Sequence, residues 1–194
     1  MPLEIDILEG ARGTGKSTLA FKLRQKTPET TLVNPTGFHT DGEEGLKKVA
    51  NYYQSWTSLL FSLIKHDSKF VFDRFYFSEY VYSTLYKEYD FDDDYSNLNE
   101  LMEDLSCMGV KINVFFLTIN DEQELQSRLI RDKIPFANAK ESVEQTLEQQ
   151  RLYKRLFESF KYDFCNENFK IYTIDTSGKT NDEVYDEILK LKTT

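Results

Sequence analysis

Apolar residues along this chain follow two patterns, short continuous runs and longer stretches in which they recur every three or four positions. A continuous run indicates a strand buried on both faces, whereas recurrence at threes and fours indicates a helix with one buried face. The runs predict strands at residues 3–8, 30–33, 69–73, 111–117 and 169–174. The helical spacing predicts helices at about 15–26, 43–66, 76–88, 97–107, 121–131, 140–160 and 181–191. We expect the acidic stretch 90–94 to be a solvated loop.

The predicted strands alternate with the predicted helices along the chain. This order predicts an α/β fold, a three-layer sandwich in which a five-stranded parallel sheet is flanked by helices and joined by right-handed crossovers. A chain of 194 residues can bury one good core, and the composition shows no seam, so we expect a single domain over 1–194. Ligands of such sheets bind at the carboxyl ends of the strands, which directs attention to the residues that follow each strand.

The first strand is followed by a sequence typical of a phosphate-binding loop. Residues 10–17 read GARGTGKS, which fits G-x-x-x-x-G-K-[ST] between a strand and a helix. The glycines permit positive φ and a close approach of backbone N–H groups to a polyphosphate, and the helix adds its positive end. We expect Lys16 to reach the β- and γ-phosphates and Ser17 to ligate Mg²⁺. The pattern thus predicts ATP and Mg²⁺ as cofactors, bound by Gly10, Gly13, Thr14, Gly15, Lys16, Ser17 and Thr18.

A second polar pair, Asp73 and Arg74, follows the buried strand at 69–73. Asp73 has the position of a Walker-B carboxylate, which holds Mg²⁺ directly or through water. The guanidinium of Arg74 suits a phosphate held by two parallel hydrogen bonds. The plainer alternatives are a helix-capping Asp73 and a structural ion pair between the two residues.

Arg128 and Arg131 are three residues apart and share a helix face. They precede 132–138, where the helical pattern breaks, so we predict a lid at about 128–140. Closure of a lid excludes water and brings positive charge onto the transferring phosphoryl group. The alternative is a solvated helix face.

Charge and cysteine usage narrow the class of partner. A net charge of -9 and a pI near 4.9 argue against a broad nucleic-acid-binding surface, because phosphate-backbone affinity comes from many cations acting together. We expect small-molecule nucleotides as partners. Two distant cysteines, no signal-peptide pattern and no apolar run long enough to span a bilayer predict a cytoplasmic protein with no membrane partner. The aromatic helices leave a homodimer open.

Several motifs together resemble the thymidylate kinase family of P-loop phosphotransferases and the related deoxynucleoside kinases. They are Glu9-Gly10 before the loop, Asp73-Arg74-Phe75 with Ser78 and Tyr82 at the following spacings, Tyr52-Tyr53-Gln54-Ser55-Trp56 on a helix, and Ile174-Asp175-Thr176-Ser177 before the final helix.

The resemblance implies roles for the residues at these positions. Arg74 would hold the acceptor phosphate, Tyr53 and Gln54 would meet the base, and Tyr82 would abut the deoxyribose, with Ser78 in the same substrate-binding set. The 128–138 region would be the lid. An amphipathic core helix is the alternative reading of Gln54 and its aromatic neighbours.

Two departures from the family pattern bear on the acceptor. Arg12 stands where thymidylate kinases usually carry an Asp, so it is a candidate to act on the phosphates and joins Lys16, Arg74, Arg128 and Arg131 as a catalytic candidate. Asn34 stands where deoxynucleoside kinases place their catalytic Glu. A nucleoside hydroxyl gains roughly 10²–10⁴-fold from a carboxylate base, whereas a monophosphate oxygen is already anionic.

The sequence therefore favours a kinase that converts a pyrimidine deoxynucleoside monophosphate, thymidylate or a modified analogue, to the diphosphate. One alternative is a deoxynucleoside kinase that acts on the 5′-hydroxyl with a displaced carboxylate from Asp41, Glu43 or Glu44. A second alternative, from another class, is a non-catalytic nucleotide-binding module.

Overall fold

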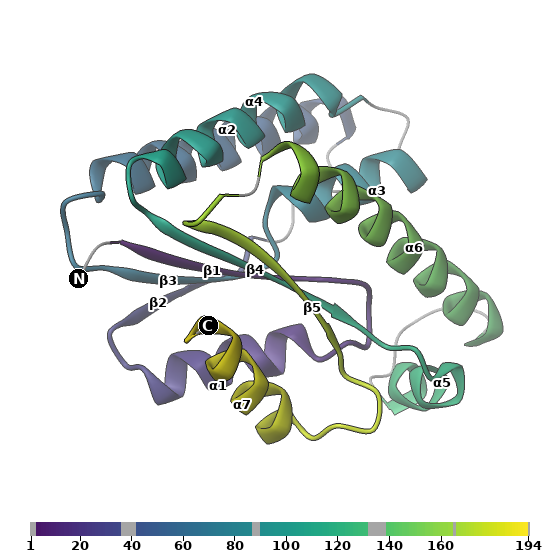
Figure 1. The fold of residues 1–194 in the computed structure, drawn as a ribbon. Helices are drawn as coiled ribbons and strands as arrows, with labels where there is room; N and C mark the ends of the chain where they lie inside the picture. The colour runs from purple at the N-terminus through teal and green to yellow at the C-terminus, as the bar shows by residue number, and fades with distance from the viewer. Residues whose placement is uncertain (1–2, 36–41, 87–89, 132–138, 165, 194) are drawn as a thin grey trace.

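The structure is a computed structural model that describes residues 3–35, 42–86, 90–131, 139–164 and 166–193 (Figure 1). The strands are β1 (Glu4–Glu9), β2 (Thr30–Val33), β3 (Lys69–Asp73), β4 (Lys111–Thr118) and β5 (Phe169–Asp175). The helices are α1 (Lys16–Lys26), α2 (Gly42–Ser62), α3 (Tyr76–Tyr86), α4 (Asp92–Cys107), α5 (Glu122–Arg131), α6 (Ala139–Asp163) and α7 (Asn181–Lys192).

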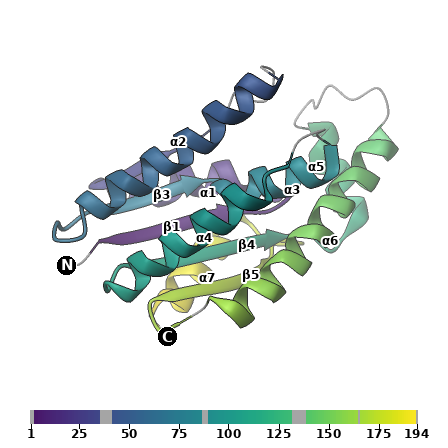
Figure 2. The same cartoon turned by 90° about the horizontal axis from the view of Figure 1, so that it is seen from above.

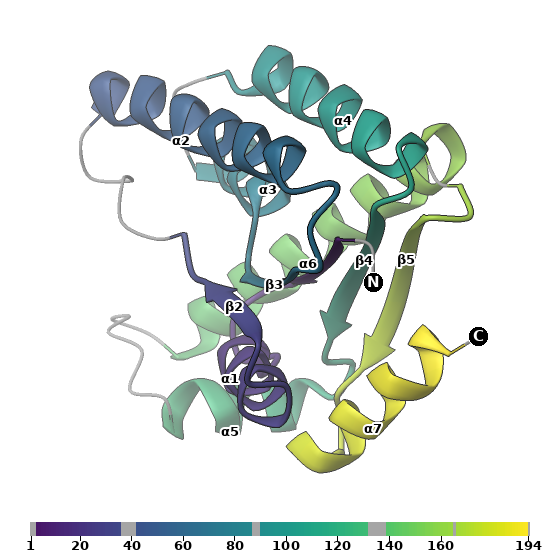
Figure 3. The same cartoon turned by 90° about the vertical axis from the view of Figure 1, so that its left-hand side faces the viewer.

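The five strands form one parallel sheet in the order β2-β3-β1-β4-β5. Helices α1 and α7 cover one face, and α2, α3, α4 and α6 cover the other, as the views in Figures 2 and 3 agree. The predicted three-layer sandwich is confirmed. Because all strands run in the same direction, their carboxyl ends share one edge of the sheet, and α5 lies beside that edge.

Two apolar clusters hold the layers together. The larger one joins the sheet to α2, α3, α4 and α6 and is rich in aromatic rings such as Phe72, Phe77 and Tyr153. The smaller one joins the sheet to α1 and α7 through aliphatic residues, among them Leu19 and Ile188. Strand residues are apolar toward both clusters, which explains why the strands appear in the sequence as continuous runs.

The two largest differences from the predicted element boundaries lie at the start of α4 and at the end of α2. Helix α4 begins at Asp92, so residues 92–94 of the acidic stretch form its first turn instead of a loop. Carboxylates are favourable there because they face the positive end of the helix dipole. Helix α2 ends at Ser62, because Leu63 N–H and His66 N–H donate to the carbonyls three residues earlier and turn the chain toward β3.

The amino-terminal strand and the carboxyl-terminal helix are joined by a partly buried ion pair. Lys192 Nζ lies 2.6 Å from Asp6 Oδ2 and 2.8 Å from Glu4 Oε1, and Asn113 Nδ2 donates to Asp6 Oδ1 at 3.0 Å. The pair fixes the end of α7 against the middle of the sheet. Within the described residues, no helix combines the length and the apolar character that crossing a membrane requires.

Candidate functional site

The loop between β1 and α1 needs glycine at three positions. Gly10, Gly13 and Gly15 have φ of 140°, 76° and 89°, in the region that side-chain-bearing residues rarely adopt. A Cβ on Gly10 would lie 3.2 Å from the carbonyl carbon of Leu117 in β4 and nearer still to its oxygen. Gly15 is the left-handed N-cap of α1. The loop geometry is therefore that of a phosphate cradle at a helix N-terminus.

Lys16 folds back over this loop. Its Nζ donates to the carbonyl oxygen of Ala11 at 2.5 Å and to Thr14 Oγ1 at 3.2 Å. Burial, and to a smaller extent the positive charge of Arg74, lowers the pKa of the Lys16 ammonium well below its ordinary value. A buried ammonium in this state is a group that a polyanionic ligand would stabilise, since an added negative charge favours its charged form.

A cavity of about 790 Å³ opens over the loop. From the predicted cofactor-binding set, Gly13, Thr14, Gly15, Lys16, Ser17 and Thr18 line this donor cavity, while Gly10 packs beneath it against β4. The donor cavity continues between α5 and the start of α7, where Arg128, Arg131, Thr176, Lys179, Thr180, Asn181 and Val184 contribute to its wall. Its shape extends from the phosphate loop toward the β5–α7 connection.

Asp73 is almost fully buried at the end of β3, 3% exposed. Asn34 Nδ2 donates to Asp73 Oδ2 at 3.1 Å, because Val33 and Phe72 are paired and the next residue of each strand emerges beside the other. Among the described residues, Asp73 Oδ1 has no hydrogen-bond partner. A buried carboxylate oxygen without a partner is costly, and Mg²⁺ or one of its waters would satisfy it. Asp73 and the exposed Ser17 hydroxyl therefore fit a magnesium site.

Arg74 has a φ of 75°, which is strained for a residue with a side chain. Its N–H donates to the Leu8 carbonyl at 3.0 Å and so continues the pairing of β3 with β1. Its guanidinium lies over the ring of Tyr82, 5.6 Å from the centroid, and Nη1 donates to Ser78 Oγ at 3.2 Å and to Tyr153 OH at 3.4 Å. Backbone strain of this kind persists where neighbouring contacts hold the residue, and the contacts with Ser78, Tyr153 and Tyr82 hold the side chain.

A second cavity of about 210 Å³, called the acceptor cavity below, adjoins the donor cavity. It is lined by Arg12, Pro35, Tyr53, Arg74, Ser78, Glu79 and Tyr82. The structure thus brings together four of the predicted substrate-binding residues, whose roles stay predictions. Arg12 and Arg74 line both cavities, so these two arginines stand at their common wall. Gln54 is partly buried on α2 and is not among the residues that line this acceptor cavity.

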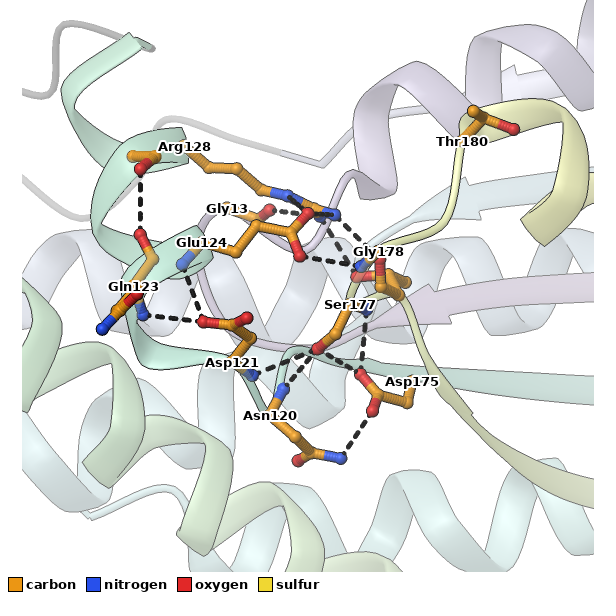
Figure 4. A network of polar contacts seen from close by, with 12 residues as sticks. Gly13, Asn120, Asp121, Gln123, Glu124, Arg128, Asp175, Ser177, Gly178 and Thr180 are labelled. Carbon is orange, nitrogen blue, oxygen red and sulfur yellow. Dashed lines mark hydrogen bonds and ion pairs between the residues drawn. The ribbon is translucent and has the colours of Figure 1, made fainter.

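Arg128 is fixed in a network that joins three segments (Figure 4). Its Nη1 donates to the carbonyl of Gly13 and to Thr176 Oγ1, both at 3.2 Å. Nη2 donates to Thr176 O at 2.8 Å and to Glu124 Oε1 at 2.5 Å, and Nε donates to the same carboxylate at 3.0 Å. These contacts occupy all five N–H donors of a guanidinium. Arg128 therefore connects α5, the phosphate loop and the β5–α7 connection.

The same network orders the far end of the donor cavity. Ser177 Oγ accepts from the N–H groups of Asn120 and Asp121 at 2.8 and 3.2 Å, and Glu124 Oε2 accepts from Gly178 N–H at 2.7 Å. The hydrogen bonds from Gly178 and Arg128 lower the pKa of the Glu124 carboxyl. Arg131, one turn beyond Arg128, is exposed and lines the donor cavity. Of the predicted lid, residues 132–138 lie outside the described residues.

Three buried polar residues near the acceptor cavity have no role among the residues predicted from the sequence. They are Glu9, fully buried at the end of β1, Tyr153 on α6, and Glu79 on α3. Burial raises the pKa of the Glu9 carboxyl, against the hydrogen bond from Ser78 and the charge of Arg74. Tyr153 falls in the apolar spacing of its helix, so only its hydroxyl distinguishes it from core. Asp41 lies outside the described residues, and the side chains of Glu43 and Glu44 are likewise not described.

Comparison with known proteins supports the predicted P-loop kinase fold. No family model and no curated protein sequence matches this chain. The solved structure of the Bacillus subtilis YorR protein in complex with phosphorylated GDP superposes with a TM-score of 0.68 and 20% identity, covering 97% of this chain and 95% of that one. A deoxyadenosine kinase from M. mycoides, with the products dCMP and dCDP bound, gives a TM-score of 0.60 and 14% identity, covering 98% and 100%.

A polyphosphate kinase 2 from Arthrobacter aurescens gives a TM-score of 0.57 and 17% identity and covers 96% of this chain but 64% of its own length. At these identities the likeness is one of fold. The predicted P-loop kinase fold, and with it the resemblance to nucleoside and nucleotide kinases, is therefore confirmed as a structural relationship.

Proposed function

We propose that this chain is an ATP-dependent kinase that transfers a phosphoryl group to the phosphate of a pyrimidine deoxynucleoside monophosphate, thymidylate or a modified analogue. The observation that carries the proposal is the common wall of the two cavities. Arg12 and Arg74 stand there. Asn34, at the position where deoxynucleoside kinases place their catalytic Glu, is an amide that donates to Asp73. Two cations and no free carboxylate at position 34 suit an acceptor that is itself an anion.

In the proposed reaction, Lys16 binds the β- and γ-phosphates of ATP, and Arg12 and Arg74 hold the acceptor phosphate beside the γ-phosphate. An oxygen of the acceptor phosphate attacks the γ-phosphorus, the bond to the β–γ bridging oxygen breaks, and ADP leaves. The attacking oxygen is already anionic at neutral pH, so no side chain has to remove a proton. Catalysis then rests on positioning and on compensation of charge.

Mg²⁺, when bound, would neutralise charge that develops on the β- and γ-phosphates. Ser17 and Asp73 are the residues that would hold it. Asn34 keeps one Asp73 oxygen engaged at 3.1 Å, so the other oxygen, Oδ1, is the one that would face the ion or its water.

The choice of a pyrimidine rests on the resemblance. Two aromatic side chains, Tyr53 and Tyr82, line the cavity of about 210 Å³ and offer ring faces that a base can contact. In this arrangement Tyr82 contacts the sugar, while its ring also supports the guanidinium of Arg74 at 5.6 Å.

A deoxynucleoside kinase is the second candidate, and Glu79 is the observation that favours it. This residue is 1% exposed and lines the acceptor cavity, so the cavity wall includes a carboxylate even though position 34 has none. A 5′-hydroxyl acceptor would use such a group as general base. Glu79→Gln separates the two candidates, since loss of a base lowers kcat for a nucleoside but not for a monophosphate.

Removal of the Arg74 side chain tests the proposal. Charged hydrogen bonds contribute about 1.5–3 kcal/mol, so Arg74→Ala should raise the KM for thymidine monophosphate roughly 10–100-fold and leave the KM for ATP nearly unchanged. Arg74→Gly should have the same KM for thymidine monophosphate as Arg74→Ala but should be more stable than Arg74→Ala, because glycine accepts the φ of 75°. Arg155→Ala, an exposed arginine on α6, is the control. Equal KM values in Arg74→Ala and the control would contradict the proposed role.

A further inference from the structure

The carboxylate of Glu9 is fully buried directly before the phosphate loop, and the proposed reaction does not use it. Its Oε1 accepts from the backbone N–H of Phe75 at 2.7 Å. Its Oε2 accepts from Ser78 Oγ at 2.5 Å and from Tyr153 OH at 3.2 Å. Three segments, the β3–α3 connection, α3 and α6, thus converge on one carboxylate.

The two hydroxyls that contact Glu9 also contact Arg74. Nη1 of Arg74 donates to Ser78 Oγ at 3.2 Å and to Tyr153 OH at 3.4 Å, and the two hydroxyl oxygens are 2.7 Å apart. Both of these hydrogen bonds use Nη1, so they do not engage Nη2 or Nε of the guanidinium. The contacts fix one end of the guanidinium.

The protons in this cluster can run in one direction only. A guanidinium donates and cannot accept, and each hydroxyl has a single proton to donate. If the hydroxyls of Ser78 and Tyr153 accept from Arg74, their own protons must reach acceptors. An ionised carboxylate is acceptor-only, so Glu9 ends the chain of hydrogen bonds that begins at Arg74. A neutral amide in its place would present either a donor to the hydroxyls or a donor to Phe75 N–H.

Glu9 also holds the backbone beside Arg74. The Phe75 N–H bonds to Glu9 on one side, and the Arg74 N–H bonds to the Leu8 carbonyl on the other, around the residue with φ of 75°. Conformations of this kind persist when neighbouring contacts over-determine them. The same β1 segment, Leu8-Glu9, therefore fixes both the backbone and the side chain of Arg74.

We propose that Glu9 is a positioning residue for the acceptor phosphate, which acts through the hydroxyls of Ser78 and Tyr153 to hold the guanidinium of Arg74. Because Tyr153 belongs to α6, the orientation of Arg74 depends on how α6 is seated against the sheet. The inference rests on the proposed function of Arg74, and it adds two residues, on β1 and α6, to the acceptor machinery.

The test uses Glu9→Gln and Tyr153→Phe, with thymidine monophosphate and ATP as the varied substrates. Tyr153→Phe removes one hydroxyl, and a hydrogen bond contributes about 0.5–1.5 kcal/mol, so the acceptor KM should rise roughly 2–10-fold. Glu9→Gln should raise it further, because its amide places an N–H donor against either the two hydroxyls or the Phe75 N–H. The ATP KM should be unchanged in both. Tyr162→Phe, 92% exposed on the same helix, is the matched control and should match the wild type.

The Arg74→Ala background gives the decisive comparison. Tyr153→Phe should have no further effect on the acceptor KM there, since its proposed target is gone. A merely structural role would raise the KM values for both substrates together, or would persist in the Arg74→Ala background, and either result overturns the inference. Tyr153→Phe carries the test even if Glu9→Gln does not fold. If Arg74→Ala itself leaves the acceptor KM unchanged, the proposed function fails and the inference with it.

Discussion

Substituting Gly10 by alanine should separate the phosphate loop from the sheet. The added Cβ would lie 3.2 Å from the Leu117 carbonyl carbon and nearer still to its oxygen, and both atoms belong to the backbone of an interior strand. Backbone atoms in β4 cannot swing aside as the tip of a flexible side chain does. The loop or the strand must therefore move, and the φ of 140° adds strain of its own.

The structure supplies a control that isolates the backbone term. Gly109 has a φ of 89° and is exposed, and a Cβ there would meet nothing within 4 Å. Gly109→Ala should therefore lower the free energy of unfolding only by the cost of the left-handed conformation, about 1–2 kcal/mol. Gly10→Ala should be destabilised by a backbone cost of about 1–3 kcal/mol for its sparsely populated φ and by an overpacking cost of about 1–3 kcal/mol, roughly 2–6 kcal/mol in total.

Urea unfolding of the two variants and the wild type measures these losses, and the KM for ATP measures the effect on the loop. We expect Gly10→Ala to be clearly less stable than Gly109→Ala and to bind ATP more weakly, while Gly109→Ala keeps the wild-type KM. Equal free energies of unfolding, with a wild-type KM for ATP in both, would refute the argument that close packing of Gly10 on β4 fixes the loop.

Three further predictions concern the metal, the α5 arginines and the ion pair at the end of the chain. Asp73→Asn should lower kcat at least tenfold and raise the Mg²⁺ concentration for half-maximal rate; an unchanged Mg²⁺ titration would contradict a metal role. Arg128→Lys should raise the KM for ATP and lower the free energy of unfolding by about 1–3 kcal/mol, whereas Arg131→Ala should lower kcat with wild-type stability; the reverse assignment would refute the network argument. Lys192→Met should lower the free energy of unfolding by roughly 1–3 kcal/mol at pH 8. Burial lowers the pKa of Lys192, but the carboxylates of Asp6 and Glu4 outweigh it and raise the pKa above 10.5, so the difference in stability between wild type and variant should shrink as the pH rises beyond that value. A stability difference that stays constant up to pH 12 would exclude the pairing with Asp6.

The fold could be predicted because local pattern and tertiary environment agree in this chain. The three central strands are buried on both faces and are mainly apolar, with exceptions such as Asp6 and Asn113, and the helices keep one apolar face. Helix α4 is the exception at its start, since Asp92–Asp94 resemble a solvated loop until their place at the helix N-terminus is known. The dipole that favours them is a property of the folded helix, which spacing alone does not reveal.

The site was only partly accessible from the sequence, for reasons of register and burial. Asn34 donates to Asp73 because β2 and β3 pair in one register, and the sequence does not state that register. Arg128 and Arg131 share a helix face, yet the first is held by contacts from three segments and the second is exposed. Tyr153 has the spacing of a core residue, and only the hydrogen bonds of its hydroxyl with Glu9 and Arg74 show that it belongs to the polar cluster.

The most direct test of the account compares kcat/KM for thymidine monophosphate with that for thymidine, at saturating Mg-ATP, and identifies the product of each reaction by mass. Cytosine and modified-uracil counterparts in the same assay define the base. The proposed function predicts a preference of at least tenfold for the monophosphates, with nucleoside diphosphate and ADP formed in equal amounts. A preference for the unphosphorylated nucleosides, with monophosphate as the product, would contradict it.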